Sequence, residues 1–350
     1  MRWRKLVFTD IFTGQHKSWF LIEIMSNDIQ KVGVFTSGGD APGMNACIRA
    51  VTRSGIHHGM KIVGICNGYN GLIDAEFSQL ESHAVGNIIR RGGTILKTAR
   101  SQRFRTADGM AQAYEALKKE GIDAVIAIGG DGTFRGANEF TDKYNIPFIG
   151  IPATIDNDMY GTDFTIGYDT AINTVVQAVD KIRDTAEAHN RLFIVEVMGR
   201  DAGFIALRSG IAVGAEAVLV PETDTHIDSL LALLERGWKR KKTGCVVIVA
   251  EGDDAGGAFD VADMVKKEFD HFDVRVSVLG HQQRGGAPTA MDRVLATRLG
   301  VGAIDGLLQG RSQVMVGVIN NEVCYTEFKK STKHHKELSE NLMYLVEVLG

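Results

Sequence analysis

Short apolar runs alternate with amphipathic stretches along the chain from residue 31 onward. Continuous aliphatic runs are typical of strands buried on both faces, and the longer amphipathic stretches between them are typical of helices. The predicted strands are 32–35, 61–65, 124–128, 147–151, 192–197, 217–220, 246–250, 275–279 and 314–319. The main predicted helices are 42–58, 171–186 and 290–308. This alternation predicts an α/β fold with mainly parallel sheets covered by helices on both faces.

The length of the chain, 350 residues, is more than one hydrophobic core usually holds, so we expect two domains. A division near residue 166 fits this length, although no Pro- or Ser-rich linker marks it. In parallel sheets, ligands bind beyond the carboxyl ends of the strands. The glycine-rich and acidic motifs described below each follow a predicted strand, so we expect one functional site along that edge.

The composition excludes several classes of protein. The formal net charge is −4 and no basic stripe is present, so we expect no binding to nucleic acid or to an acidic membrane surface. The longest apolar runs have the length of strands, which predicts no membrane span. The cysteines, Cys47, Cys66, Cys245 and Cys324, lie far apart without a C-x-x-C pair, which favours a reduced, cytoplasmic location.

The first residues are unlike the rest of the chain. Arg2, Arg4 and Lys5 precede a polar stretch, and its one apolar cluster, 19–22, is shorter than the roughly 7–15 apolar residues of a secretory signal. Met25 stands shortly before the first predicted strand. We expect either that Met25 is the natural start or that the residues before it form a disordered tail. Residues 1–30 are then an extension outside the folded domains.

Two glycine-rich turns follow predicted strands. The turn 36–45 has glycines at the spacing of a Walker A loop, but Met44-Asn45 stands where that loop has Lys and Ser or Thr. It predicts backbone N–H groups and a helix N-terminus aimed at an anion, or else only a tight turn. The run 129–133, Gly-Gly-Asp-Gly-Thr, repeats the pattern. Its Asp131 suits Mg²⁺ beside phosphates, or else it caps a helix.

The acidic run 152–158, Pro-Ala-Thr-Ile-Asp-Asn-Asp, follows another predicted strand. Asp156 and Asp158 can divide the work of a reaction, since one carboxylate accepts a hydroxyl proton while the other shapes the field or a metal site. An isolated run of this kind is usually a solvated loop. Because the Walker lysine is absent, the neutralisation of phosphate charge would fall to the metal and to arginine side chains.

Several arginines lie near strand ends or in glycine-rich turns, where their planar side chains can clamp phosphate. Each one alone is more simply a surface residue, but together they predict a phosphate site. His281 shares a turn with Arg284 and is a candidate donor to a sugar or a phosphate, although a lone histidine is more often structural. The candidate arginines are Arg100, Arg191, Arg200, Arg275 and Arg284.

In this order, the motifs resemble those of bacterial-type ATP-dependent 6-phosphofructokinases. The resemblance covers about residues 31–325 and rests on the runs 36–45, 129–133, 152–158, 198–200 and 280–286. It implies two Rossmann-like domains with the active site in the cleft between them. The larger, ATP-binding domain would comprise residues 31–166 plus 282–332, and the smaller, fructose 6-phosphate-binding domain residues 167–281 plus 333–350. It also implies phosphoryl transfer from ATP to the 1-hydroxyl of fructose 6-phosphate with Mg²⁺, and a homotetramer.

The resemblance also implies roles for individual residues. Asp156 would be the general base, Asp158 would support it, Thr154 would contact the substrate near the transferred group, and Arg200 would stabilise the transition state. The residues expected to hold ATP are Gly39, Arg100, Ser101, Gly130, Asp131, Gly132 and Thr133, with Asp131 also holding Mg²⁺. The residues expected to hold the sugar phosphate are Thr154, Ile155, Asp156, Met198, Gly199, Arg200, Glu251, His281, Gln282, Gln283 and Arg284, with Arg191 and Arg275 supplied by a neighbouring subunit.

Two positions bear on the phosphoryl donor. Relatives that use pyrophosphate carry Asp where this chain has Gly132 and Lys where it has Ala153. A carboxylate at the first position would crowd the α-phosphate of a nucleotide, and a lysine at the second would serve the smaller donor. The small residues at both positions therefore favour ATP.

The family also has an effector site between subunits that binds ADP or phosphoenolpyruvate. The residues that match it are Arg49, Arg53, Arg183, Gly214, Glu216, Arg240 and Lys242. Glu76 stands where the family often has Arg, and Thr243 replaces a Lys. Because a glutamate would repel an effector phosphate, we expect catalysis to be intact and effector regulation to be weakened or altered.

Two other functions remain open at this point. A kinase of the wider fold group, such as an NAD kinase, accounts for residues 129–133 but leaves Asp156, Asp158 and the arginines without a role. A non-catalytic subunit that senses sugar phosphate would be expected to lose the base or the metal carboxylate. Here Asp156 and Asp131 are both present, which favours the enzyme.

Overall fold

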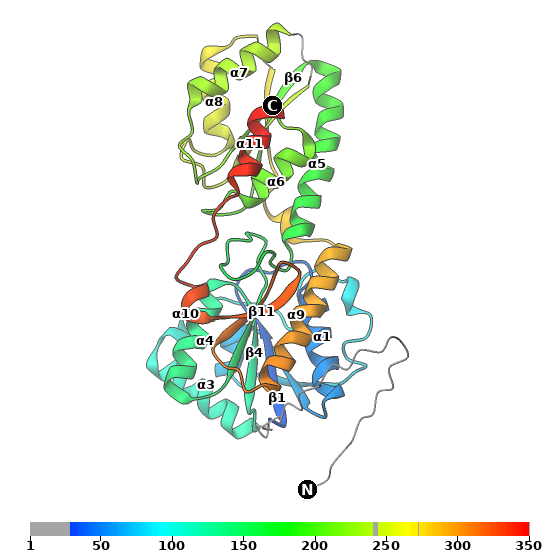
Figure 1. Ribbon diagram of the computed structural model, residues 1–350, viewed down its shortest axis with the longest axis vertical. Coiled ribbons are helices and arrows are strands. Elements are labelled where there is room, and N and C mark those ends of the chain that lie inside the picture. Colours follow the sequence, from blue (N-terminus) through cyan, green and yellow to red (C-terminus); the bar gives the residue numbers. More distant parts are fainter. Residues whose placement is uncertain (1–28, 241–243, 272, 350) are drawn as a thin grey trace, which may run out of the picture.

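The structure, a computed structural model, describes residues 29–240, 244–271 and 273–349. Met25 and nearly all of the expected extension 1–30 therefore lie outside the described residues, as do Lys242 and Thr243. The chain forms two bodies, one above the other in Figure 1, each built around its own β-sheet. The fold is α/β with mainly parallel strands, which confirms the prediction from the hydrophobic pattern.

The larger sheet has seven strands in the order β11-β10-β5-β4-β1-β2-β3. Its five inner strands are parallel, whereas β3 and β11 pair antiparallel at the two edges. The hydrophobic pattern predicts every inner strand and neither edge strand. The strands are β1 Lys31–Thr36, β2 Lys61–Ile65, β3 Phe77–Leu80, β4 Ala124–Gly129, β5 Phe148–Pro152, β10 Val314–Ile319 and β11 Glu322–Glu327.

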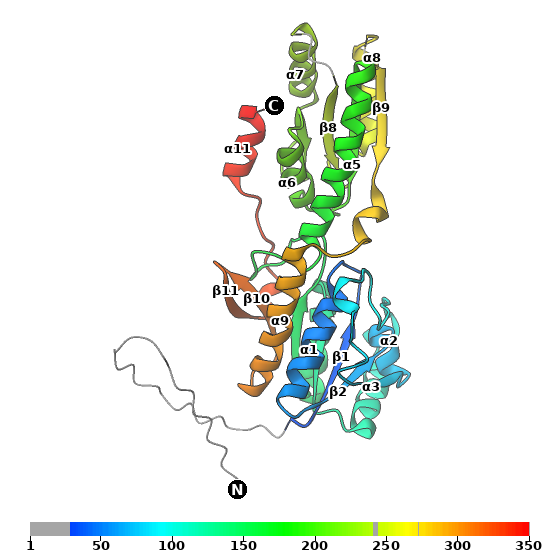
Figure 2. The ribbon, with the colours of Figure 1, turned by 90° about the vertical axis from the view of Figure 1, so that its right-hand side faces the viewer.

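Neighbouring residues of the inner strands face two different helical layers. Val34 and Ile126 belong to a buried cluster with residues of α1 and α9, while Phe35 and Val125 belong to another with residues of α3 and α4. Apolar side chains on both faces are what a buried parallel sheet requires. In Figure 2 the layer of α1 and α9 lies across β1 from α2 and α3. The helices are α1 Met44–His57, α2 Gly68–Ile73, α3 Ala107–Glu120, α4 Asp131–Tyr144, α9 Ala290–Leu308 and α10 Phe328–Ser331.

The smaller sheet has four strands in the order β7-β8-β6-β9, and all of its pairings are parallel. The helices α5 and α6 share a buried cluster with one face of this sheet, and α7 and α8 share a cluster with the other face. Within the described residues, no helix is both long enough and apolar enough to cross a membrane. The elements are α5 Tyr168–His189, β6 Arg191–Val197, α6 Phe204–Val213, β7 Ala217–Leu219, α7 Ile227–Lys239, β8 Cys245–Ala250, α8 Ala258–Glu268, β9 Asp273–Val278 and α11 Glu340–Leu349.

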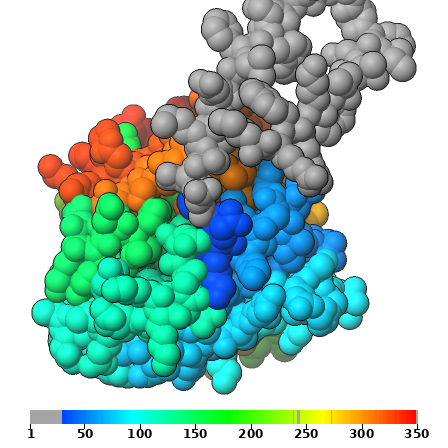
Figure 3. Space-filling model, turned by 90° about the horizontal axis from the view of Figure 1, so that it is seen from below, coloured from blue at the N-terminus to red at the C-terminus, as the bar shows by residue number. Residues whose placement is uncertain are grey.

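Segments far apart in the sequence make up the larger body. β10 pairs with β5 and α9 packs on α1, so the chain leaves this body after β5 and returns to it after β9. From below, the blue-to-green segments and the orange segments lie side by side (Figure 3). At the end of the chain, α11 packs against α6 and β7 of the smaller body. We therefore propose the division expected above: residues 31–166 plus 282–332 as the larger domain, and residues 167–281 plus 333–350 as the smaller.

Candidate active site

A cavity of about 880 Å³ opens at the carboxyl ends of the parallel strands of the larger sheet. Its walls include the turn after β1, the loop after β4 and the loop after β5. Two arginines close it at the junction of the domains: Arg200, which follows β6 of the smaller domain, and Arg284, in the 3₁₀-helix η3 (Gly280–Arg284). The structure thus brings together at one edge the motifs that the sequence placed after three different strands.

The turn after β1 is shaped by glycines. Gly38 and Gly43 have φ values of 91° and 112°, in the left-handed region that favours glycine, and Gly43 precedes the first turn of α1. Gly39 lies beneath Arg284, because a Cβ at this position would stand 2.6 Å from Arg284 Nη1. Arg284 also donates a hydrogen bond to the carbonyl oxygen of Asp40 (3.3 Å). Gly39 therefore lets the arginine fork lie against an anion-binding turn.

The loop after β4 carries a carboxylate at a helix N-terminus. Asp131 is the first residue of α4, where exposed N–H groups favour anions. Its Oδ2 forms an ion pair with Arg135 (2.8 Å), while its Oδ1 is buried and has no hydrogen-bond partner among the described residues. Burial raises the pKa of Asp131, and Arg135 opposes that rise. A Cβ added at Gly132 would meet no atom within 4 Å, so the cavity is open at this point.

The loop after β5 holds the two acidic residues in place through its backbone. Asn157 has a φ of 55°, and its side-chain oxygen accepts a hydrogen bond from the Thr165 N–H (2.9 Å). The Asp156 N–H donates to Thr154 Oγ1 (3.2 Å). This turn places the side chains of Asp156 and Asp158 in the cavity wall on either side of Asn157.

Asp156 is the most deeply buried acid of the cavity, with 3% of its surface exposed. Burial raises its pKa, the nearby Asp158 raises it further, and Arg200 and Arg284 act in the opposite direction. Arg200 Nε lies 3.8 Å from Asp156 Oδ2, and no described residue bonds to Asp156 Oδ1. Burial also raises the pKa of Asp158, and Asp131 adds to this rise. Asp156 thus lines the cavity with one buried carboxylate oxygen that no described residue bonds.

Arg200 is held by a side chain beneath its own backbone. Glu251 Oε1 accepts hydrogen bonds from the N–H groups of Arg200 (2.7 Å) and Gly199 (3.3 Å), and Arg200 has a left-handed φ of 53°. The preceding N–H, of Met198, donates to Oε1 of the buried Gln283 (2.9 Å). These bonds connect the loop after β6 with the loop after β8 and with η3, so Glu251 and Gln283 position the arginine.

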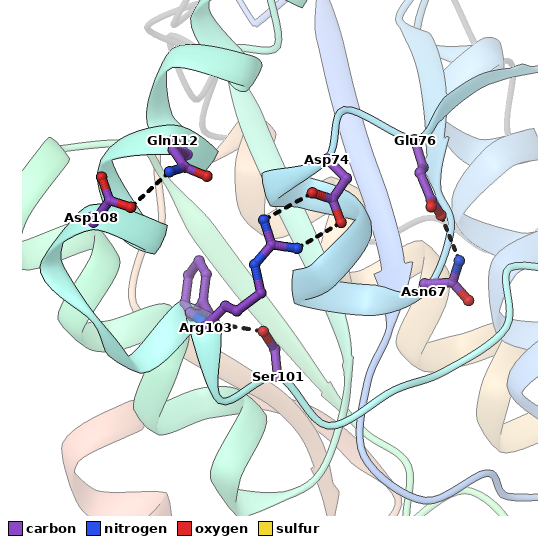
Figure 4. Close-up of polar contacts among 8 residues, drawn as sticks. Asn67, Asp74, Glu76, Ser101, Arg103, Asp108 and Gln112 are labelled. Carbon is purple, nitrogen blue, oxygen red and sulfur yellow. Dashed lines mark hydrogen bonds and ion pairs between the residues drawn. The ribbon is translucent and has the colours of Figure 1, made fainter.

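A loop with Arg100 at its start forms the outer wall of the cavity. Residues 100–102, 104 and 105 line the cavity, whereas Arg103 turns away from it. Arg103 forms two hydrogen bonds with Asp74, of 2.9 Å each, as Figure 4 shows. Inside the loop, Ser101 Oγ accepts a hydrogen bond from the N–H of residue 104 (3.1 Å). A bidentate ion pair therefore anchors this wall from outside.

Part of this wall carries no motif in the sequence. Tyr69 and Phe104 line the cavity, and their rings stack with centroids 3.9 Å apart and planes 19° apart. The Tyr69 hydroxyl also donates to the carbonyl oxygen of Thr133 (2.6 Å). Both aromatic residues lie in runs with no motif, and only their placement in space reveals them.

Two of the candidate arginines lie elsewhere. Arg191 is the first residue of β6, and it pairs with Asp273 (2.7 Å), the first residue of β9. Arg275 also pairs with Asp273 (3.0 Å). The prediction that these arginines stand at the ligand-facing strand ends is therefore wrong for Arg191 and Arg275, which lie toward the amino end of the smaller sheet. His281 is exposed in η3, outside the cavity wall.

The candidate effector residues fall into two groups within one chain. Arg49 and Arg53 lie on α1 of the larger domain. In the smaller domain, Arg183 donates hydrogen bonds to the carbonyl oxygens of Val213 (2.7 Å) and Gly214 (3.1 Å) at the end of α6. The buried Glu216 accepts a hydrogen bond from the Val246 N–H (2.5 Å). Arg240 is exposed and follows α7. Glu76, the departure from the family pattern, accepts a hydrogen bond from Asn67 (2.5 Å), as Figure 4 shows.

The acids of the cavity suit a metal that is shared with phosphates. In the part of the chain that the structure describes, no three His, Cys, Asp or Glu side chains cluster closely enough to hold a metal ion by themselves. Mg²⁺ needs no such cluster, since it usually binds one or two carboxylates and completes its shell with phosphate oxygens and water. The buried oxygens Asp131 Oδ1 and Asp156 Oδ1, both without a described partner, fit that requirement.

Positioning groups, arginines and a proton acceptor meet here between two α/β domains, which defines a phosphoryl-transfer enzyme. Comparison with known proteins agrees, because a family model described as Phosphofructokinase matches residues 31–307. The chain therefore belongs to the phosphofructokinase family.

Relatives match nearly the whole chain. The chain is 52% identical over 322 residues to ATP-dependent 6-phosphofructokinase 2 of Bacteroides thetaiotaomicron, covering 92% of this chain and 99% of that protein. It is 50% identical to ATP-dependent 6-phosphofructokinase 1 of Thermus thermophilus, covering 92% of this chain and 100% of that protein.

Solved structures share the fold. Phosphofructokinase from Saccharomyces cerevisiae matches with a TM-score of 0.83 and 36% identity, over 87% of this chain and 45% of the longer yeast chain. The pyrophosphate-dependent phosphofructokinase from Marinobacter aquaeolei matches with a TM-score of 0.79 at 22% identity, over 92% of this chain and 91% of that one, and this likeness is one of fold.

Proposed function

We propose that this chain transfers the γ-phosphoryl group of ATP to the 1-hydroxyl of fructose 6-phosphate, which gives fructose 1,6-bisphosphate and ADP in glycolysis. The observation that carries this proposal is Asp156, a buried carboxylate that lines the cavity, with one oxygen that no described residue bonds and with Arg200 3.8 Å from the other. The names of the relatives that match over almost their full length support the same reaction.

In this mechanism Asp156 accepts the proton of the attacking hydroxyl. Burial supports that role, because it raises the pKa of Asp156 and so makes the carboxylate a better base. Asp158 adds negative field beside it. Arg200 contributes positive charge where charge develops on the transferred group. The N-terminus of α4 and the turn after β1 orient the phosphates of the donor through backbone N–H groups.

We further propose that Asp131, with Asp158 or Asp156 beside it, holds Mg²⁺. The buried oxygen Asp131 Oδ1, which no described residue bonds, supports this assignment, and Arg135 pairs with the other oxygen. When bound, Mg²⁺ neutralises phosphate charge. The arginines and the helix N-terminus supply the rest of the positive field, since the chain has no Walker lysine.

The sugar phosphate would lie between the domains. Arg284 and His281 from η3, with residues 154–156 and 198–200 and with Glu251, would hold it from one subunit. Arg191 and Arg275 point to a second copy of the chain, because they lie outside the cavity of their own copy. The two separate groups of candidate effector residues support the same assembly, a homotetramer with active and effector sites between subunits. Light scattering on the purified protein would test the number of subunits.

The location and the regulation complete the proposal. Cys47, Cys66 and Cys324 carry free thiols, which supports a cytoplasmic location. Regulation by ADP or phosphoenolpyruvate would be weak or altered because Glu76 places negative charge where the family often has a cation. Rate curves against fructose 6-phosphate with each effector would test this, and strong responses to both effectors would contradict it.

The experiment that tests the main proposal is a comparison of donors on the purified protein. Fructose 1,6-bisphosphate formation from fructose 6-phosphate would be measured with ATP and with pyrophosphate, each with and without Mg²⁺. Of these four conditions, we expect turnover only with ATP in the presence of Mg²⁺. Turnover with pyrophosphate would overturn the assignment of ATP as the phosphoryl donor. An inactive protein that still binds fructose 6-phosphate would favour a non-catalytic sensing subunit.

A further inference from the structure

The last part of the chain crosses from one domain to the other past the candidate active site. Residues 332–338, which we call the strap, follow α10 and lead to α11 on the smaller domain (Figure 1). The proposed mechanism uses none of these residues. The other two crossings, into α5 and from η3 into α9, lie on the opposite side of Figure 1, where α5 and α9 meet.

The α5–α9 crossing is fixed by one buried carboxylate. Asp292, in the first turn of α9, accepts hydrogen bonds from the N–H groups of Gly167 and Thr170 at the start of α5, each 2.8 Å long. Asp292 is 1% exposed. Hydrogen bonds to a buried carboxylate therefore fix the two domains to each other on this side of the junction. On the other side, the distance between the domains depends on the contacts of the strap.

The strap bonds to the supports of the catalytic carboxylates. The Lys336 N–H donates to the carbonyl oxygen of Asp158 (3.2 Å), and His335 forms a single antiparallel bridge with Met159. At the start of the strap, the carbonyl oxygen of Thr332 accepts from Arg135 Nη2 (3.2 Å), the arginine that pairs with Asp131. The segment thus contacts the acidic loop after β5 directly, and it contacts Asp131 of the larger domain only through Arg135.

The side chain of Lys336 reaches between the domains. Its Nζ donates to the carbonyl oxygen of Asp163 (2.5 Å) and lies 6.0 Å from the ring centre of Phe164 in the larger domain. It also lies 5.4 Å from the ring centre of Phe204, the first residue of α6 in the smaller domain. Among the described residues, no carboxylate forms an ion pair with this ammonium group. Its partners are one carbonyl oxygen and two aromatic faces, which attract a cation most when water is excluded.

These contacts join the two halves of the catalytic pair. Phe204 belongs to the helix that follows the Arg200 loop, while Asp158 and Asp163 belong to the loop that carries Asp156. A lysine bound to both sides therefore limits how far Arg200 and Asp156 can move apart. The side chain is half-buried, which supports its placement between the two domains.

We propose that Lys336 is a positioning residue, which holds the acidic loop of the larger domain against the Arg200 side of the smaller domain. This inference rests on the proposed phosphoryl transfer. Because most of the nucleotide wall belongs to the larger domain alone, Lys336 should matter for turnover and for the sugar phosphate and little for ATP binding.

The test compares Lys336→Met, which keeps the length of the side chain and removes its charge, with Lys336→Arg and with the control Lys333→Met on the exposed start of the strap. We expect Lys336→Met to lower kcat/KM for fructose 6-phosphate about ten- to hundredfold, because a small misplacement of reacting groups is costly. The dissociation constant for ATP, measured by calorimetry, should change less than about twofold, because the variant alters the position of the domains and leaves most of the nucleotide wall intact. Lys336→Arg should recover much of the loss, and the control should match the wild type.

Several outcomes would decide the matter. A lower Tm with unchanged kcat/KM in Lys336→Met would overturn the proposal and leave Lys336 a merely structural residue. An equal loss of ATP affinity would overturn it as well. If Lys336→Met does not fold, Phe204→Leu should show the same split between turnover and ATP binding, and its absence would count against the proposal. A wild-type protein without kinase activity would instead refute the proposed function.

Discussion

Asp156 and Arg200 face each other across the junction of two domains, with Oδ2 and Nε 3.8 Å apart. Asp156 follows β5, the last strand before the chain leaves the larger domain, and Arg200 follows β6, the first strand of the smaller one. The proposed proton acceptor and the cation proposed to stabilise the transferred group are therefore carried by different bodies. In the proposed mechanism, catalysis depends on their relative position as well as on each side chain.

Replacing Asp156 by Asn should abolish most of the turnover. The amide keeps the shape of the carboxylate and cannot accept the hydroxyl proton, so kcat should fall about 10²–10⁴-fold while KM for fructose 6-phosphate changes little. Steady-state kinetics measures both quantities. Asn157→Ser, which leaves both carboxylates in the sequence, is a neighbouring variant for comparison. Near-normal turnover in Asp156→Asn would refute the assignment of the base.

The pH dependence of kcat/KM should report the electrostatics of Asp156. Only the ionised carboxylate accepts a proton, so activity should fall as pH falls through its pKa. Burial raises that pKa, so the acid limb should lie above the range of a free aspartate, near pH 4. Arg200→Gln removes a charge that lowers the pKa and should move the limb to higher pH, whereas Asp158→Asn should move it to lower pH. If the acid limb lay at the same pH in the wild type and in both variants, this account of the pKa of Asp156 would be contradicted.

Replacing Gly132 by Asp should damage ATP use without damaging the fold. A Cβ at this position meets no atom within 4 Å, so the new carboxylate projects into the open cavity, toward the phosphates of the donor. We expect kcat/KM for ATP to fall about a hundredfold through crowding and repulsion, with Tm nearly unchanged. Gly132→Ala is the matched control, and a similar loss in that variant would show that any side chain, charged or not, blocks the site.

Breaking the Asp74–Arg103 pair should loosen the outer wall of the nucleotide site. The pair is half exposed, so we expect a modest rise in KM for ATP, about two- to fivefold, in Asp74→Ala, Arg103→Ala and the double variant alike. The swap Asp74→Arg with Arg103→Asp should restore part of the affinity. Glu120→Ala, which breaks a surface pair at the start of β1, is the control. Additive losses in the double variant would contradict coupling between the two residues.

The regular elements were predictable wherever burial determined them. The expected helix 290–308 and the strands 61–65 and 314–319 coincide with α9, β2 and β10. Their apolar residues must be buried, and the length of each apolar segment determines whether a helix or a strand buries them. β3 was not predictable, since it is a four-residue edge strand, Phe-Ser-Gln-Leu, whose two middle residues are exposed. Its pairing with β2 depends on a neighbour in space and leaves no mark in the local pattern.

The residues of the site were predictable where a motif follows a strand. They were not predictable where the site depends on contacts between residues that are distant in the sequence. Asp131, Asp156 and Gly39 lie in the cavity because carboxyl ends of parallel strands share an edge. Tyr69 and Lys336 have no motif around them, and their roles arise from elements that are distant in the sequence. Arg191 lies at the amino end of β6, and its position in the sequence could not show this, because closeness to a strand end does not reveal which end it is.

The pairing of β10 with β5 also shapes how the chain is made. During synthesis β5, with Phe148 and Ile149, leaves the ribosome long before residues 314–319 exist, and the four strands of the smaller sheet are translated in between. Until β10 arrives, the nascent chain presents an apolar parallel strand with an unpaired edge, which is a template for aggregation. The four strands of the smaller sheet can therefore pair before the larger sheet is complete, and the interval before β10 arrives is the period in which a chaperone would be most useful to this chain.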